Sequence, residues 1–120
     1  MNDMKTTYNK DAPLPMTLQA FRNRPCTLPW TNENYQAPTP GEVSQLIKLA
    51  GWSQNDAAKI VGVSWHPKKG SSTIRKWKSE KSSSDAREIP YSAWRMLLLH
   101  SGIVTIDDAM KELDSFKNLK

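Results

Sequence analysis

The sequence has very little cysteine and no long apolar run. Its 120 residues include one cysteine, Cys26, which cannot form a disulfide within the chain and so agrees with a reducing compartment. No stretch provides the roughly 20 apolar residues that a transmembrane helix needs, and the first residues lack the apolar core of a signal peptide. We therefore expect a cytoplasmic protein with no membrane segment.

Residues in patterns typical of catalytic or metal sites are also scarce. The two histidines, His66 and His100, are far apart and have no cysteine or acidic neighbour at metal-ligand spacing. There is no glycine-rich phosphate loop, and the pair Asp107 and Asp108 is better explained as acidic residues in the first turn of a helix. We expect a protein that is not an enzyme and that has no metal and no cofactor.

Positive charge exceeds negative charge in this small chain. The sequence has 17 Lys and Arg against 12 Asp and Glu, a formal net charge of +5 at pH 7. A basic surplus is compatible with a polyanionic partner such as nucleic acid. Many small basic proteins bind no nucleic acid, however, so the distribution of the charges matters more than their sum.

Residues 1–38 are polar and contain five of the eight prolines. Proline at this frequency argues against a long helix or a central strand. We expect an irregular N-terminal arm with a short helical turn at residues 16–21. The basic cluster at residues 22–24 leaves two interpretations open, contact with a DNA minor groove or a solvated surface. Several apolar side chains could dock the arm on the rest of the protein: Leu18, Phe21, Leu28, Trp30 and Tyr35.

Helical signals begin at residue 39 and recur almost to the C-terminus. Thr39, Pro40 and Glu42 suit the cap, the first and the third position of a helix that ends before Gly51. Apolar residues at helical spacing predict further helices at 53–62, 72–80, 90–101 and 105–116. No strand pattern is present. The sequence predicts an all-α fold of about five helices, in which residues 39–120 form one domain.

The order of features in residues 54–77 resembles the helix-turn-helix of lambda-repressor-like (XRE-type) regulators. Ala58 is small where two helices would cross, Gly62 suits a left-handed turn, and Trp77 would anchor the second helix. The resemblance extends over residues 39–103. It implies a lambda-repressor-like bundle and a sequence-specific transcriptional regulator, most simply a repressor, encoded on a phage, plasmid or other mobile element.

The same resemblance implies which side chains contact double-stranded DNA. Arg75 is the main candidate for a bidentate contact to guanine, and Lys76 for a contact to phosphate or a single acceptor. The ordinary alternative for each candidate is a polar surface residue. The remaining candidates lie near the ends of the two helices: Gln54, Asn55, Ser71, Ser72, Thr73 and Lys78.

The chain departs from the family in the connection between these two helices. Typical members pass from the turn glycine to the second helix in about half the distance seen here. The extra residues fall within 65–70, where Pro67 and Gly70 mark a loop. Two interpretations remain open: Lys68 and Lys69 grip the DNA beside the helix, or the loop is a tolerated insertion with solvated lysines.

Aromatic and apolar residues predict the core and one further contact surface. Trp77 and Trp94 lie on apolar helical faces and should be buried, whereas Trp65 in the inserted loop should be exposed. The apolar residues near the C-terminus exceed what a small core needs, so we expect part of them to form a homodimer seam. A plain five-helix core is the alternative. These apolar residues are Met96, Leu97, Leu98, Leu99, Ile103, Ile106 and Met110.

Two other classes of function stay open. An antitoxin-like module of the same fold would bind a partner protein, and its apolar arm would become ordered only with that partner. An accessory protein would bind nucleic acid without sequence preference and with strong salt dependence. Binding to unrelated duplexes therefore separates the second class from a specific regulator.

Overall fold

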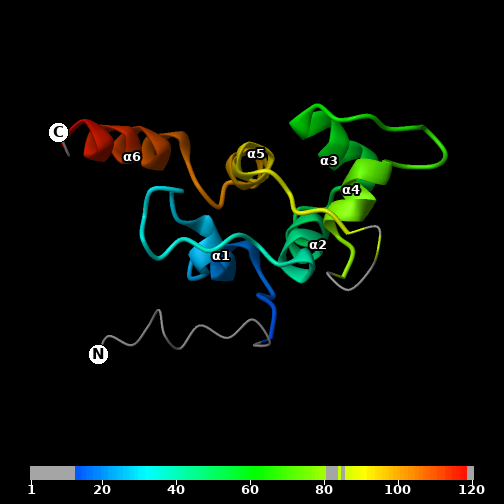
Figure 1. Ribbon diagram of the computed structural model, residues 1–120, viewed down its shortest axis with the longest axis horizontal. Coiled ribbons are helices and arrows are strands. Elements are labelled where there is room, and N and C mark those ends of the chain that lie inside the picture. The colour runs from blue at the N-terminus through cyan, green and yellow to red at the C-terminus, as the bar shows by residue number, and fades with distance from the viewer. Residues whose placement is uncertain (1–12, 81–83, 85, 119–120) are drawn as a thin grey trace.

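Regular structure in this protein is helical wherever the chain is described. The computed structural model describes residues 13–80, 84 and 86–118 (Figure 1). Within these residues no strand occurs, and the all-α prediction is confirmed. No described helix is both long enough and apolar enough to cross a membrane. The elements are α1 (Leu18–Phe21), a 3-10 helix (Pro25–Thr27), α2 (Pro40–Leu49), α3 (Gln54–Val61), α4 (Ser72–Trp77), α5 (Tyr91–Ser101) and α6 (Ile106–Asn118).

Helix bounds differ from the predicted ones at α4, which ends at Trp77 rather than at residue 80. The amide of Lys78 donates to the carbonyls of both Ile74 and Arg75, and the Ser79 hydroxyl donates to the Arg75 carbonyl at 2.9 Å. Bonds of this kind satisfy the last carbonyls of a helix and close it. A short α4 leaves few side chains on its exposed surface.

Side-chain caps set where the longer helices begin. Three helices start with a pair of residues that exchange hydrogen bonds in both directions. Because amides at a helix start have no partner within the helix, such bonds fix its first residue. The predicted caps are confirmed. The pairs are Thr39 with Glu42 at α2, Ser53 with Asp56 at α3, and Thr105 with Asp108 at α6.

α5 runs through the middle of the molecule and carries the centre of the core (Figure 1). Trp94, Leu97 and Leu98 on this helix are fully buried, and the helix packs against α3. The predicted burial of Trp94 and Trp77 is confirmed. The other helices contribute further buried side chains, among them Val43, Leu46, Ile47, Ala57, Ala58 and Ile74.

Part of the segment before residue 39 packs into this core. Phe21 and Cys26 are buried. The Trp94 indole Nε1–H donates to the Cys26 carbonyl at 2.8 Å, and Arg95 Nη1 donates to the Thr27 carbonyl at 3.2 Å. These bonds join residues 68 positions apart in the chain. The domain boundary at residue 38 stays a prediction.

The buried carboxylate of Glu42 links the same segment to α2. Glu42 is 1% exposed, and its Oε1 accepts from the Thr39 amide at 2.9 Å. Its Oε2 lies 3.6 Å from Arg24 Nη1 and 3.7 Å from Cys26 Sγ. Burial, followed by the nearby carboxylate, raises the pKa of the Cys26 thiol well above its ordinary value. Arg24, which we expected in a minor groove or in solvent, instead partners a buried charge.

Replacing Glu42 should therefore destabilise the whole fold. In Glu42→Ala the Arg24 guanidinium loses its carboxylate partner and the Thr39 amide loses its acceptor, which should lower the free energy of unfolding by about 2–4 kcal/mol. Asp56→Ala removes a carboxylate from the exposed capping pair of α3 and should cost much less. Urea unfolding followed by tryptophan fluorescence measures both variants. Equal decreases in the free energy of unfolding would show that the buried Glu42 carboxylate stabilises the fold no more than an exposed capping carboxylate does.

The exposed caps should lose their effect in acid. Hydrogen bonds from Ser53 lower the pKa of Asp56 below its ordinary 3.8, and hydrogen bonds from Thr105 do the same for Asp108. A carboxyl with a lowered folded-state pKa stabilises the fold fully above its unfolded pKa and loses this effect as pH falls through the folded value. We expect both carboxyls to titrate below 3.8 when followed by NMR. Titration at the ordinary value would contradict this.

Candidate nucleic-acid interface

α3 and α4 pack against each other, with residues 62–71 connecting them. Ala57 and Ala58 on α3 are fully buried, and small side chains allow neighbouring helices to approach closely. Gly62 ends α3 with φ +80°, a left-handed conformation that glycine adopts at little cost. The predicted small residues and the predicted turn glycine are thus present as expected.

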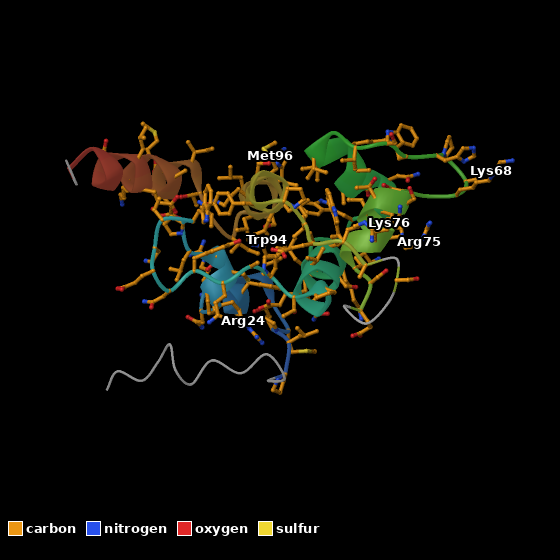
Figure 2. The ribbon with its side chains drawn as sticks, in the orientation of Figure 1. Arg24, Lys68, Arg75, Lys76, Trp94 and Met96 are labelled. Atoms are coloured by element: carbon orange, nitrogen blue, oxygen red, sulfur yellow. The ribbon has the colours of Figure 1, made fainter. Side chains whose placement is uncertain are left out.

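α4 has one buried face and one outward face. Ile74 and Trp77, three positions apart, are buried in the core. Ser72 and Arg75 are exposed, and Lys76 is half-buried. Figure 2 shows Arg75 and Lys76 on α4, at the end of the molecule away from α6. The outward face is therefore cationic. Two other predicted site residues on this helix and at its end, Thr73 and Lys78, are half-buried.

Two predicted site residues form hydrogen bonds inside the protein. Ser71 is fully buried; its hydroxyl donates to the Ser64 carbonyl at 2.8 Å and accepts from the Ile74 amide at 3.3 Å, which caps α4. Gln54 Oε1 accepts from the Ser71 amide at 3.1 Å. Ser71 has no exposed surface to offer a duplex, because a helix cap turns its side chain back toward the backbone.

The inserted loop between α3 and α4 is closed by hydrogen bonds. His66 and Gly70 exchange backbone bonds of 2.8 and 3.0 Å in an isolated antiparallel bridge. Between them, His66 Nδ1 accepts from the amides of Lys68 at 3.1 Å and Lys69 at 3.2 Å. Asn55 Nδ2 on α3 donates to the His66 carbonyl at 3.0 Å. The loop carries Lys68 and Lys69 exposed beyond the helices (Figure 2).

The part that His66 plays in this loop was not predicted from the sequence. There the residue was weighed only as a metal ligand, and it has no cysteine or acidic neighbour at metal-ligand spacing. The sequence offers no clear signal for this role, because Asn, Asp, Ser and Thr are the usual residues whose side chains close such turns and histidine is not among them. Gly70 also has a second role, since a Cβ there would lie 2.5 Å from Gln54 Oε1 and would disturb its bond to Ser71.

A hollow of about 320 Å³ lies between the loop and α4. Lys69 from the loop and Arg75 from the helix both line it. Trp65, exposed as predicted, lies under Lys59 Nζ, which is 4.4 Å from its ring centroid. In the described chain, no three His, Cys, Asp or Glu side chains lie where they could hold a metal ion. Cations and hydroxyls around a hollow suit a phosphate group or a base edge. The lining consists of Ser64, Trp65, His66, Lys69, Gly70, Ser72 and Arg75.

Comparison with known proteins identifies the family of this chain. No protein-family model matches the chain. Two relatives from Escherichia coli, each named transcriptional repressor protein KorC, are similar to it. One is 35% identical over 71 residues, which is 59% of this chain and 74% of the relative. The other is 36% identical over 74 residues, which is 62% of this chain and 78% of the relative. The chain therefore belongs to the family of the KorC transcriptional repressor proteins.

Proposed function

We propose that this protein represses transcription by binding a specific double-stranded DNA site through α4. The observation that carries the proposal is the two-sided character of this helix, which buries Ile74 and Trp77 and exposes Arg75. A helix held in this way can be inserted into a major groove. The relatives named transcriptional repressors support the regulatory role.

We also propose that α3 and α4 form an XRE-type helix-turn-helix in a lambda-repressor-like domain spanning residues 39–120. The left-handed Gly62 and the buried Ala57 and Ala58 support this assignment. The resemblance of residues 54–77 to regulators of phages and plasmids supports an origin on a mobile element.

The predicted site residues divide by their surroundings. Arg75 contacts a guanine, because an exposed arginine on a groove helix can make a bidentate bond. Gln54 and Asn55 position other groups, because each forms a hydrogen bond to the chain on the far side of the turn. The other exposed or half-exposed candidates contact phosphates or base edges: Lys68, Lys69, Ser72, Thr73, Lys76 and Lys78.

The charge distribution favours the same orientation on DNA. Figure 1 shows α6 at the opposite end of the molecule from the loop that joins α3 and α4. This distant helix carries four acidic residues, Asp107, Asp108, Glu112 and Asp114, against two basic ones, Lys111 and Lys117. Phosphates repel an acidic helix and attract a basic one, so the electric field turns the α4 end toward a duplex.

A dimer formed through α6 completes the proposal. Ile106, Met110 and Leu113 are 64%, 61% and 51% exposed and follow one another at helical spacing along one face. The predicted apolar patch is thus divided, since Leu97 and Leu98 belong to the core. We call Ile106, Met110 and Leu113 the α6 stripe. A second copy of the chain packed on this stripe would bury these side chains and supply a second copy of α4 to the DNA.

Removal of the Arg75 side chain should weaken binding to the specific site. In Arg75→Ala we expect a loss of about 1–3 kcal/mol, that of one good base contact. Lys111→Ala removes the same charge from an exposed position on α6 and should change little. Fluorescence anisotropy at near-physiological salt, with a duplex from the protein's own gene neighbourhood and a scrambled one, measures both variants.

Either of two results would contradict the proposed function. If the native protein binds both duplexes equally, it is an accessory nucleic-acid-binding protein rather than a specific repressor. If it binds neither, DNA is not its target and a protein partner becomes the candidate.

A charge placed on the α6 stripe should prevent dimerisation. We expect Met110→Asp to convert a dimer into a monomer, because the carboxylate would be desolvated between two apolar helices. Met16→Asp introduces the same charge at a methionine that is 78% exposed in the N-terminal segment, and it should leave the dimer intact. Sedimentation velocity over a micromolar concentration series measures the state. A native monomer throughout, or a dimeric Met110→Asp variant, would exclude this seam.

A further inference from the structure

We propose that His66 is a positioning residue for DNA binding: its imidazole fixes Lys68 and Lys69 so that the loop and α4 hold the DNA backbone as one unit. The inference deepens the proposed function and rests on it.

The first observation is the double acceptor role of the imidazole. His66 Nδ1 lies 3.1 Å from the Lys68 amide nitrogen and 3.2 Å from that of Lys69. In both bonds Nδ1 is the acceptor, which leaves Nε2 as the ring nitrogen that can donate. Pro67, which lies between the acceptor and these donors, has a fixed φ and restricts the backbone further. The backbone of Lys68 and Lys69 is therefore held in a closed turn in the free protein.

The second observation is that α3 holds both ends of this loop. Asn55 Nδ2 donates to the His66 carbonyl at 3.0 Å, and Gln54 Oε1 accepts from the Ser71 amide at 3.1 Å. Ser71 in turn caps α4. Two neighbouring side chains at the start of α3 thus connect the loop to the helix that carries Arg75.

The third observation is the shared hollow. Lys69 and Arg75 line the same space of about 320 Å³ between loop and helix, and His66 lines it as well. Figure 2 shows Lys68 at the outer end of the loop. An ordered pair of lysines loses less conformational entropy on binding than a flexible pair does. Removing the imidazole should therefore weaken the phosphate contacts even though both lysines remain.

The test compares three histidine variants at several salt concentrations. We expect His66→Ala to weaken binding about three- to tenfold and to make the dependence of affinity on salt shallower, since fewer phosphates are neutralised. His66→Asn should retain most of the native affinity, because an asparagine oxygen accepts from amides two and three residues later. His100→Ala is the matched control; this histidine is exposed on α5, where its ring bonds to the Met96 carbonyl.

A second background separates positioning from a general loss of stability. In the double variant Lys68→Ala/Lys69→Ala, His66→Ala should cause no further loss, because the groups that it positions are already gone. Hydrogen exchange of the Lys68 and Lys69 amides should be faster in His66→Ala than in the native protein. The thermal midpoint of each variant checks that the fold is intact.

The inference is overturned if His66→Ala binds with native affinity and native salt dependence, or if its loss persists undiminished in the double lysine variant. In both cases a weakened Arg75→Ala would leave the proposed function standing. If the native protein has no preference for its own duplex, the proposed function fails, and this inference fails with it.

Discussion

A helix of only six residues, such as α4, cannot form by itself, and this constraint shapes the rest of the structure. Isolated helices below about a dozen residues are marginal in water, so α4 depends on contacts outside its own backbone. Ile74 and Trp77 supply burial on one side, and the Ser71 hydroxyl caps the first turn. The same burial decides which side chains face outward. The burial of Ile74 and Trp77 therefore both stabilises α4 and determines which of its side chains are exposed.

The support for α4 reaches back to segments far away in the chain. α4 packs on α3, and α3 packs on α5, whose Trp94 bonds to the carbonyl of Cys26. Cys26 itself is buried like a small hydrophobic residue, and burial raises the pKa of its thiol, which disfavours the thiolate form. Glu42 fixes the same segment to α2 through Arg24. A segment rich in proline and poor in helix therefore contributes to the rigidity of the core that holds α4.

Local signals in the sequence were sufficient to predict the helices, whereas they did not predict the contacts between residues far apart in the chain. Capping pairs, apolar spacing and Gly62 depend on neighbours within a few positions, and they predicted the longer helices and the burial of Trp77 and Trp94. The pairing of Arg24 with Glu42 crosses 18 positions and leaves no periodic trace. The buried Ser71 shows the same limit: its type suits a cap and a DNA contact equally well, and only the packing distinguishes them.

On the proposed function, the inserted loop offsets the shortness of the helix. Six residues, two of them in the core, leave little surface for recognition. A longer helix would need further anchoring side chains, whereas a loop adds cations without enlarging the core. Lysines on a free loop would lose much conformational entropy on binding, and the bonds from Asn55 and within the His66 turn reduce that loss before DNA arrives. On this proposal, the loop adds Lys68 and Lys69 to the DNA-binding surface without requiring further side chains in the core.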